Sequence, residues 1–287
     1  MEKNILILGS EGMLGNTVYL YLTKTFAGSI FGTSRKKTNS KGFYYLEVKS
    51  VEKDFNQIIK KICHIEYVIN CIGVLKNSSL DELFFVNTDF PKKLSKLSKK
   101  YNFKLIHVST DAVFSENAGT VTESDIPNPS DQYGESKLLG EPNSSNSISF
   151  RTSIIGFHPS GNRGILEWVL NNKSKSIPGY ANQKWSGCTT LQFAKLCEDI
   201  IVNNKFSTLR EISPVFHFVP IGPITKYELI NEFLKASHLK KSPQKKEGNV
   251  ISRTLQSLYF DYSENKKYTN NIKRALEELI AFEKKII

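Results

Sequence analysis

A short apolar run that ends in a glycine-rich turn, within the first fifteen residues, limits the folds open to this chain. The run is "NILIL" (Asn4–Leu8), and the turn "GSEGMLG" spaces Gly9, Gly12 and Gly15 three residues apart, with a helix expected from Met13. Glycines in such a turn let the backbone bend tightly, let a pyrophosphate approach, and let the helix pack closely on the strand. The pattern therefore predicts a dinucleotide-binding βαβ unit, for which a plain strand-to-helix turn is the alternative.

The same turn and the end of the next strand indicate the cofactor. Met13 and Leu14 at the helix N-terminus would direct unpaired N–H groups and the positive end of the helix dipole at the phosphates. The second expected strand ends in "GTSRKK", with Ser34 and Arg35 where an NAD-specific site usually has an acidic residue. Because a guanidinium can hold a 2′-phosphate through two hydrogen bonds, the sequence favours NADP, with NAD as the alternative. Arg35 can also belong to an ordinary basic loop.

The first half of the chain alternates short apolar runs with longer amphipathic ones. The runs expected to be strands are nearly free of charge: Asn4–Leu8, Ser29–Ser34, Phe43–Val48, Tyr67–Ile72 and Lys104–Ser109. The segments with helical periodicity between them are Met13–Lys24, Val51–Cys63 and Leu80–Tyr101. Continuous apolar strands suit a sheet that is covered on both faces. The expected fold class is α/β, a doubly wound Rossmann sheet of parallel strands built from right-handed βαβ units.

After Gly156 this regular alternation ends. Helices are expected near Gly164–Asn172, Leu191–Val202, Lys226–Ala236 and Ile272–Lys285, separated by long polar loops. One of these loops, Lys240–Asn249 ("KKSPQKKEGN"), is expected to be a solvated linker. We expect residues 1–156 to form a dinucleotide-binding domain and residues 157–287 to form a smaller α/β substrate-binding lobe, which can interleave with the first.

Composition excludes several classes of protein. The chain is 39% hydrophobic and 23% charged, which is typical of globular proteins. No apolar run approaches the ~20 residues that span a bilayer, and the N-terminal apolar segment is too short for a signal peptide. We therefore expect a cytoplasmic location and no membrane partner. The four cysteines form no CxxC pair and the five histidines show no metal-ligand spacing, so no metal site is expected.

The net charge of +11 raises the question of a nucleic-acid partner. The lysines of "KKLSKLSKK" (Lys92–Lys100) alternate with leucines at helical spacing, as on a solvated helix face. No zinc-finger, helix-turn-helix or RNA-binding signature accompanies them, so no nucleic-acid partner is expected. An anionic small substrate agrees better with the excess of positive charge.

The stretch "DQYGESKLLGE" (Asp131–Glu141) has a tyrosine, Tyr133, four residues before a lysine, Lys137. The spacing alone is uninformative, because the chain has four such pairs, beginning at Tyr45, Tyr133, Tyr180 and Tyr262. The setting distinguishes this pair, since the preceding strand ends in "HVSTDAVF" and places Thr110 and Asp111 at the carboxyl edge of the sheet, where ligands bind. Tyr133 and Lys137 would share one helix face beside that edge. A packed tyrosine and a solvated lysine are the alternative.

These motifs together resemble the extended short-chain dehydrogenase/reductase superfamily and, within it, the dTDP-4-dehydrorhamnose reductase family, which acts on nucleotide-linked 4-keto sugars. The matching segments follow the family's order and spacing from about Ile5 to Gly156: "GSEGMLG", "NCIG" (Asn70–Gly73), "VNTDFP" (Val86–Pro91), "STDAVF" (Ser109–Phe114), "YGESKLLGE" (Tyr133–Glu141) and "FRTSIIG" (Phe150–Gly156). Beyond Gly156 the likeness thins to "TTLQFAK" (Thr189–Lys195) and "TKYELI" (Thr225–Ile230).

The resemblance implies a catalytic triad of Thr110, Tyr133 and Lys137. Tyr133 would protonate the alkoxide that forms when hydride adds to a ketone. The Lys137 ammonium, together with the positive nicotinamide of the oxidised cofactor, would lower the pKa of the phenol. Tyr133 and Lys137 would also bind the cofactor, Lys137 through the nicotinamide ribose hydroxyls, and Thr110 would orient the carbonyl oxygen.

The family pattern implies further cofactor contacts. The backbone at Cys71, Ile72 and Gly73 would line the channel for the cofactor. Asn87 would lie near the cofactor, and a polar helix residue satisfied within the protein is the alternative. Dehydrating relatives have Asp-Glu after the threonine, whereas here Asp111 is followed by Ala112, so dehydration is disfavoured. Rhamnose reductases commonly have tyrosine at that position, so the substrate can differ from theirs.

The substrate is expected to contact Asp111 at the sheet edge and two loops of the second lobe, Phe157–Leu170 and Gly179–Thr190. Within these loops the residues suited to a nucleotide diphosphate or a sugar are Asn162, Arg163 and Trp185, because arginine forks a phosphate and tryptophan stacks on a ring. The alternative is that Trp168 and Trp185 belong to the core of the lobe, and this applies at least as well to Trp168.

The function expected from this resemblance is NADPH-dependent reduction of a 4-keto group on a nucleotide-activated deoxysugar, in surface-polysaccharide biosynthesis. The partner would be a nucleotide-diphosphate sugar, and a homodimer is the assembly to expect if the chain oligomerises. Two alternatives stay open. A sugar-nucleotide epimerase would use the same triad and retain NAD, and a catalytically silent regulatory subunit would keep only the NADP-binding fold.

Overall fold

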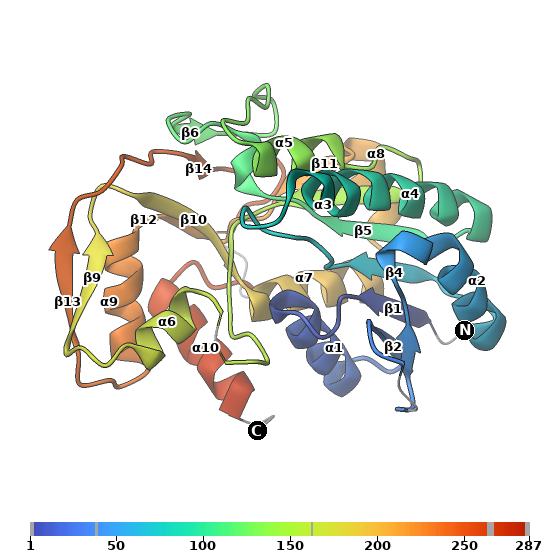
Figure 1. The fold of residues 1–287 in the computed structure, drawn as a ribbon, viewed down its shortest axis with the longest axis horizontal. Helices are drawn as coiled ribbons and strands as arrows, with labels where there is room; N and C mark the ends of the chain where they lie inside the picture. Colours follow the sequence, from blue (N-terminus) through green and yellow to red (C-terminus); the bar gives the residue numbers. More distant parts are fainter. Residues whose placement is uncertain (1–2, 38–39, 162, 263–266, 285–287) are drawn as a thin grey trace.

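A sheet of seven parallel strands lies at the centre of the computed structural model, which describes residues 3–37, 40–161, 163–262 and 267–284 (Figure 1). The strands in spatial order are β11 (Val215–His217), β7 (Ser147–Arg151), β5 (Lys104–Val108), β4 (Tyr67–Asn70), β1 (Asn4–Leu8), β2 (Ser29–Ser34) and β3 (Phe43–Tyr45). The apolar side chains of β1 and β4 are buried on both faces of the sheet. The predicted doubly wound α/β fold is confirmed.

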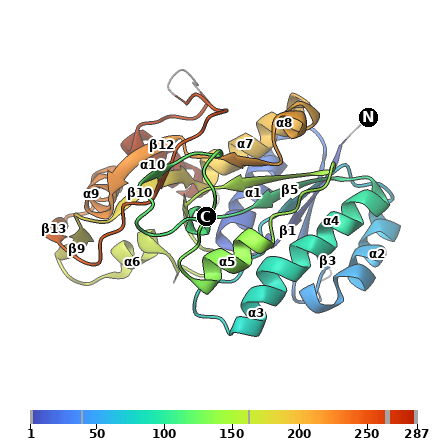
Figure 2. The same cartoon turned by 90° about the horizontal axis from the view of Figure 1, so that it is seen from above.

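Helices cover both faces of this sheet (Figure 2). On one face, α1 (Met13–Thr25) and α7 (Thr190–Val202) pack against the strands, with α8 (Phe206–Ile212) beside them. On the other face lie α2 (Val51–Ile62), which follows the short helix η1 (Val48–Ser50), and α4 (Phe90–Tyr101). Helix α4 buries Phe90, Leu94 and Leu97 at helical spacing and leaves most of its lysines exposed, as the sequence predicts.

The helix expected over Leu80–Tyr101 is divided into three parts. α3 (Leu80–Phe84) is followed by the π-helical turn η2 (Phe85–Asp89) and then by α4. Pro91 has no N–H group with which to continue the α-helical hydrogen bonds across this point. Wide turns of this kind often occur near functional sites, and this one contains Asn87.

The second half of the chain contributes to the large sheet and also builds a smaller lobe. Helix α7 and strand β11 belong to the large sheet and its layers, so the ranges 1–156 and 157–287 interleave in space. The smaller lobe has a three-stranded sheet of β12 (Ile221–Thr225), β10 (Lys184–Thr189) and β8 (Ile154–Ile155). Its helices are α6 (Ile165–Asn171), α9 (Lys226–Ala236) and α10 (Ile272–Lys284), which pack around a separate apolar core.

Two segments expected to be loops are strands instead. Ser242–Lys246, inside the expected linker, is β13 and pairs in parallel with β9 (Ser176–Tyr180). Half of the expected substrate loop Gly179–Thr190 is strand β10. β13 has a largely exposed and strongly polar sequence, so no alternation of apolar residues marks it as a strand. Another small sheet joins β6 (Thr120–Val121) to β14 (Thr254–Leu255). Within the described ranges, the helices are too short or too polar to cross a bilayer.

A buried ion pair ties the end of α5 (Gln132–Leu139) to β7. Arg151 donates from Nε and Nη2 to the two carboxylate oxygens of Glu141, each at 2.8 Å, and each side chain is only 7% exposed. Glu141 also accepts a hydrogen bond from the Ser109 hydroxyl at 2.6 Å. The pair therefore fixes the carboxyl end of β5 to the helix that follows it.

Replacing Glu141 by glutamine should lower the free energy of unfolding by about 3 kcal/mol, because the Arg151 guanidinium would stay buried without a counter-charge. Urea unfolding measures this change. The matched control is Lys273→Gln, which breaks an exposed pair with Glu277 and should cost less than about 1 kcal/mol. Equal losses in the two variants would contradict the prediction.

Candidate functional site

The glycine turn lies where the order of strands reverses. From β1 the chain builds the sheet outward to β2 and β3, and from β4 it builds the sheet in the opposite direction. Gly9 has φ of 77°, in the left-handed region that favours glycine, and a Cβ at Gly15 would lie 2.2 Å from the Gly9 carbonyl oxygen. The N-cap residue of α1, Gly12, provides no side-chain cap. The first N–H groups of α1 therefore remain available to an anion at this crevice.

The segment after β4 passes directly beside this turn. A Cβ at Gly9 would lie 3.2 Å from the Ile72 backbone nitrogen. Asn87 clamps the segment in place, since its Oδ1 accepts from Val74 N and its Nδ2 donates to Val74 O, both at 3.0 Å, and to Ser136 Oγ at 3.1 Å. Both polar atoms of the Asn87 side chain thus form hydrogen bonds within the protein. This is the alternative that the sequence left open, a polar helix residue satisfied by the protein itself. Asn87 positions the loop Cys71–Gly73 beside the crevice.

The end of β2 is tied to the same turn. Ser10 Oγ donates to Thr33 O at 2.8 Å and accepts from Thr33 N at 2.9 Å, and Gly9 N donates to Thr33 Oγ1 at 3.1 Å. Ser34 is buried, and its hydroxyl accepts from the backbone N–H of the second residue after it. The Arg35 side chain is exposed just beyond the strand. The Arg35 guanidinium is therefore accessible at the sheet edge where the 2′-phosphate of NADP would lie.

Helix α5 is held very close to two backbone segments. Asp131 caps it by accepting from Gly134 N at 2.7 Å, and the Asp131 carboxylate also pairs with Lys76. A Cβ at Gly134 would lie 2.0 Å from the carbonyl oxygen of Ala112 in η3 (Asp111–Val113), and one at Gly140 would lie 1.8 Å from the carbonyl oxygen of Asn87. Only glycine allows these contacts, so α5 has one position between β5 and η2.

This position of α5 brings Tyr133, Thr110 and Lys137 to the carboxyl end of β5. Tyr133 is half-buried, and its hydroxyl lies beside the Thr110 side chain, which lowers the pKa of the phenol. Lys137 is 5% exposed and donates from Nζ to the Val108 carbonyl oxygen at 2.6 Å. Its Nζ would also lie 3.9 Å from a Cβ at Gly73, on the cofactor side of the crevice. The structure thus gathers the three side chains that the sequence placed at one edge.

The electrostatics of the site differ from the sequence-based expectation. Burial raises the pKa of Tyr133 to about 12, and the Asp111 and Asp131 carboxylates act in the same direction, against the hydrogen bond with Thr110 and the charge of Arg253. The lowering of this pKa that the sequence predicts, by Lys137 together with the oxidised nicotinamide, stays a prediction for the cofactor-bound protein. Burial also lowers the pKa of Lys137 to about 8, against the attraction of Glu141, so the ammonium is a weaker charge than expected.

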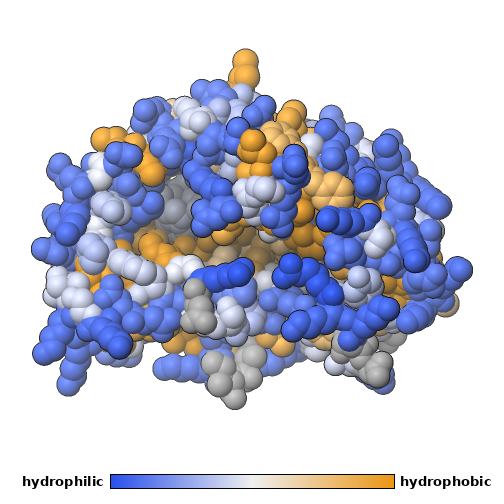
Figure 3. Space-filling model, in the orientation of Figure 1, coloured by the Kyte–Doolittle hydropathy of each residue, from blue (hydrophilic) through white to orange (hydrophobic). Residues whose placement is uncertain are grey.

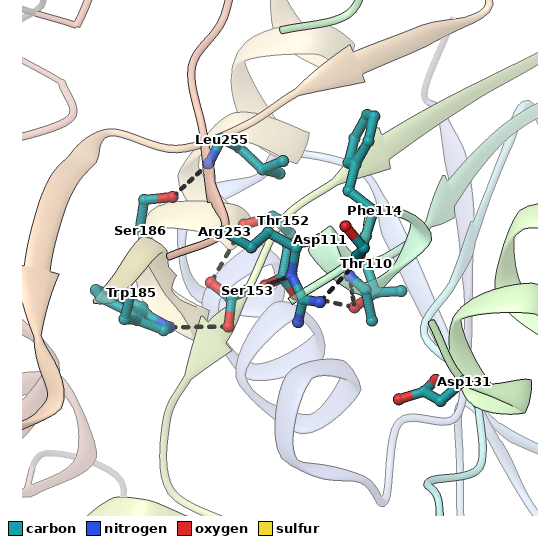
Figure 4. A network of polar contacts seen from close by, with 12 residues as sticks. Thr110, Asp111, Phe114, Asp131, Thr152, Ser153, Trp185, Ser186, Arg253 and Leu255 are labelled. Atoms are coloured by element: carbon teal, nitrogen blue, oxygen red, sulfur yellow. Dashed lines mark hydrogen bonds and ion pairs between the residues drawn. The ribbon is translucent and has the colours of Figure 1, made fainter. Parts of the chain in front are cut away.

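Sequence reasoning missed Arg253, which lies at the same edge (Figure 4). Its Nε donates to Asp111 Oδ2 at 3.0 Å and its Nη1 to the Phe114 carbonyl oxygen at 2.8 Å. Asp111 in turn accepts from Thr110 Oγ1 at 3.1 Å. The pairing spans 142 positions of sequence, which no local pattern can reveal. The sequence offers one indication of such a residue. Arginine is rare in this chain, with six of the 39 basic residues, so each arginine is a candidate for a specific ion pair.

The residues of the second lobe that were expected to contact the substrate lie in different surroundings. Trp185 is 8% exposed, belongs to the core of the smaller lobe and donates from Nε1 to Ser153 Oγ at 2.8 Å. For Trp168 the alternative was a place in the core of the lobe. Trp168 is 42% exposed, so the core interpretation is wrong for this residue. Arg163 is exposed, and Asn162 lies outside the described residues.

A second cation missed from the sequence faces the same edge. Lys226 at the start of α9 donates to Gln183 Oε1 at 2.7 Å. Burial lowers its pKa, against the attraction of Asp111 and Glu116. Figure 3 shows that this face of the molecule is hollowed between the smaller lobe and the large sheet, with hydrophobic residues in the hollow and hydrophilic residues around it. This hollow can admit a ligand whose ring is apolar and whose ends are charged.

A different cavity, of about 600 Å³, lies at the opposite end of the strands and is lined by residues such as Asn102, Lys104 and Arg210. None of the predicted site residues lines it. Its position beside the amino end of β5 is unfavourable for a dinucleotide, which binds at carboxyl ends. Across the described residues, no cluster of three histidine, cysteine or acidic side chains could hold a metal ion.

Comparison with known proteins agrees with this geometry. A family model described as the RmlD substrate binding domain matches residues 3–254. The fold is similar to that of a dTDP-4-dehydrorhamnose reductase from Clostridium acetobutylicum, with a TM-score of 0.77 and 20% identity over 98% of this chain and 99% of that one. A dTDP-4-dehydrorhamnose reductase from Bacillus anthracis in complex with NADP gives a TM-score of 0.74 and 16% identity, again over 98% and 99%.

Among curated proteins, subunit beta of methionine adenosyltransferase 2 from Bos taurus is 29% identical over 148 residues, which are 49% of this chain and 42% of that protein. The chain thus matches less than half the length of the curated relatives. At these identities the solved structures demonstrate the fold, and the family match confirms the resemblance predicted from the motifs.

Replacing Lys137 by methionine should remove a pH-dependent penalty on folding. The pKa of Lys137 is about 8 in the folded protein against 10.5 for the free side chain, so above pH 8 the unfolded state binds more protons. Stability therefore rises with pH in this window. The free energy of unfolding of the wild type, relative to Lys137→Met, should increase by roughly 2 kcal/mol between pH 7 and pH 10.

Urea unfolding at several pH values measures this difference, in which other titrating groups cancel. Lys96→Met, on the exposed face of α4, is the matched control and should keep a constant difference from the wild type. A constant difference for Lys137→Met as well would refute the lowered pKa.

Proposed function

The chain belongs to the family of the RmlD substrate binding domain, and on that premise we propose that it reduces the 4-keto group of a nucleotide-activated deoxysugar with NADPH. The observation that supports this most directly is the position of α5, which brings Tyr133 and Lys137 to the carboxyl end of β5 beside Thr110, with Lys137 Nζ donating to the Val108 carbonyl oxygen at 2.6 Å. A keto oxygen placed between these hydroxyls would be polarised and then protonated. The product would serve surface-polysaccharide biosynthesis in the cytoplasm.

The crevice suits a dinucleotide on several counts. The glycine turn leaves room where a Cβ would block it, and the start of α1 presents uncapped N–H groups to a pyrophosphate. The Arg35 guanidinium is exposed beyond β2, where a 2′-phosphate would pair with it. Lys137 Nζ is positioned to hold the ribose hydroxyls beside Gly73. NADPH is therefore favoured over NADH.

NADPH, when bound, would supply a hydride to the keto carbon. Tyr133, which is protonated at neutral pH, would give its proton to the resulting alkoxide oxygen. Thr110 orients that oxygen by hydrogen bonding, and Lys137 stabilises the tyrosinate left behind. A proton from solvent then restores the phenol.

A catalytically silent regulatory subunit is the second candidate, because the curated relatives are named as a subunit of another enzyme. Such a subunit would bind NADP without turning over a sugar. The presence of Thr110, Tyr133 and Lys137 together at the carboxyl end of β5 favours the reductase. A sugar-nucleotide epimerase remains a third candidate and would isomerise a sugar without net consumption of cofactor.

Tyr133→Phe should lower kcat for reduction of the 4-keto nucleotide sugar by about 100-fold or more, because the proton donor is lost. Its dissociation constant for NADPH should stay within about twofold, since the phenol contributes little to cofactor affinity. Loss of NADPH absorbance with a panel of 4-keto nucleotide sugars measures turnover, and fluorescence titration measures binding.

Tyr259→Phe is the matched control for this test, because Tyr259 is 44% exposed and lies outside the segments expected to contact the cofactor or the substrate. It should leave turnover unchanged. Binding of NADPH with no turnover of any sugar by the wild type would support the silent subunit, and isomerisation without NADPH loss would support the epimerase.

Arg35→Ala should weaken binding of NADPH by roughly tenfold and leave binding of NADH unchanged, because one charged pairing with the 2′-phosphate disappears. Fluorescence titration with each cofactor measures both constants. Lys37→Ala, which removes a neighbouring exposed charge, should change either constant by less than about threefold. If Arg35→Ala weakens both cofactors equally, Arg35 does not recognise the phosphate.

A further inference from the structure

Asp111 lies between a proposed catalytic hydroxyl and a cation from the far end of the chain. Its Oδ1 accepts from Thr110 Oγ1 at 3.1 Å, and its Oδ2 accepts from Arg253 Nε at 3.0 Å. The Thr110 hydroxyl has a single proton, which it can give either to Asp111 or to a substrate oxygen. The strength with which Asp111 holds that proton therefore determines what Thr110 can do.

Arg253 is held in place by the backbone around it. Ser252 N and Arg253 N both donate to the Glu116 carbonyl oxygen, at 2.9 and 3.0 Å, and Thr254 N donates to Gly119 O at 2.8 Å. Leu255 N donates to Ser186 Oγ at 2.8 Å, which joins the segment to the smaller lobe. The Arg253 side chain is only 11% exposed. It is therefore preorganised against Asp111, unlike a solvated surface arginine.

The charges that face Tyr133 occur in pairs. Asp131 on the N-cap of α5 pairs with Lys76, and Asp111 in η3 pairs with Arg253. Without Arg253, the Asp111 carboxylate would lose its ion-paired cation, and its negative charge would act more strongly on the phenol and on an alkoxide forming on the substrate. Figure 4 shows the guanidinium reaching across to the segment that contains Thr110, Asp111 and Phe114.

We propose that Arg253 is a positioning residue for the reaction: by binding the Asp111 carboxylate, it leaves the Thr110 proton for the substrate oxygen and offsets the negative charge beside Tyr133. This inference rests on the proposed reductase function. Arg253 itself touches neither the phenol nor the crevice in the contacts described, so its effect passes through Asp111. The pairing makes the smaller lobe part of the chemical site, because Ser186 anchors the segment that holds Arg253.

The test is a charge cycle of Arg253→Gln, Asp111→Asn and the double variant, with steady-state reduction of the 4-keto nucleotide sugar as the assay. Arg253→Gln should lower kcat about 30-fold and leave KM within about threefold, because the effect falls on the transition state. Asp111→Asn alone should have a smaller effect. The double variant should recover to within about fivefold of the wild type, because the unopposed carboxylate is gone.

The pH profile provides a readout that a structural role would not change. In Arg253→Gln, the alkaline pH at which kcat falls should move upward, because Asp111 and Asp131 would then hold the Tyr133 proton with one fewer opposing cation. In the double variant it should return toward the wild-type value. Arg253→Lys, which keeps the charge, should lie between the wild type and Arg253→Gln.

Folding is monitored by Tm and by NADPH affinity, both of which should change little in all four proteins. The matched control is Lys195→Gln, which breaks the 2.7 Å ion pair with Glu278 away from the site and should leave kcat unchanged. A double variant as slow as Arg253→Gln, or a normal kcat in Arg253→Gln, overturns the inference while the reductase function stands. A wild type that reduces none of the sugars overturns the proposed function and this inference with it.

Discussion

The approach of α5 to two backbone carbonyl oxygens is the contact on which the rest of the site depends. Gly134 and Gly140 let the helix lie against η3 and η2 at distances that no side chain would permit. Lys137 lies between these two contacts and Tyr133 directly precedes the first, so neither can shift without moving the helix. The buried pair of Glu141 and Arg151 then fixes the end of the helix to the sheet. Close packing, more than any single hydrogen bond, therefore determines where the proposed acid points.

Burial and charge have opposite effects in this site. Burial raises the pKa of Tyr133 and lowers that of Lys137 to about 8, so at neutral pH the phenol is protonated and most Lys137 side chains still carry a positive charge. The nearby carboxylates are each matched by a cation, Asp111 by Arg253 and Asp131 by Lys76. The negative charges beside Tyr133 are therefore neutralised within the site. A site of this kind accepts a transient anion more readily than one with an unopposed carboxylate.

The parts that the sequence could predict are those that depend on neighbouring residues. The strand at Asn4–Leu8, its glycine turn and the helix from Met13 are determined by local spacing, and the structure has them at the predicted places. The helix of Tyr133 and Lys137 follows from its N-cap at Asp131. Arg253 depends on a contact across 142 positions, and β13 pairs through its backbone with a polar sequence. The direction of the Tyr133 pKa depends on burial, which a sequence pattern does not measure.

Strand β11 follows its sheet neighbour β7 only much later in the sequence, which affects how the protein folds during synthesis. β7 lies between β5 and β11 in the sheet, yet 63 positions separate the end of β7 at Arg151 from the start of β11 at Val215 in the sequence. While a ribosome is still adding those residues, the outer hydrogen-bonding edge of β7 has no partner strand, and α7 has not yet covered the face beneath it. Such an edge can pair with another nascent chain. Translation speed across this stretch therefore bears on the yield of folded protein.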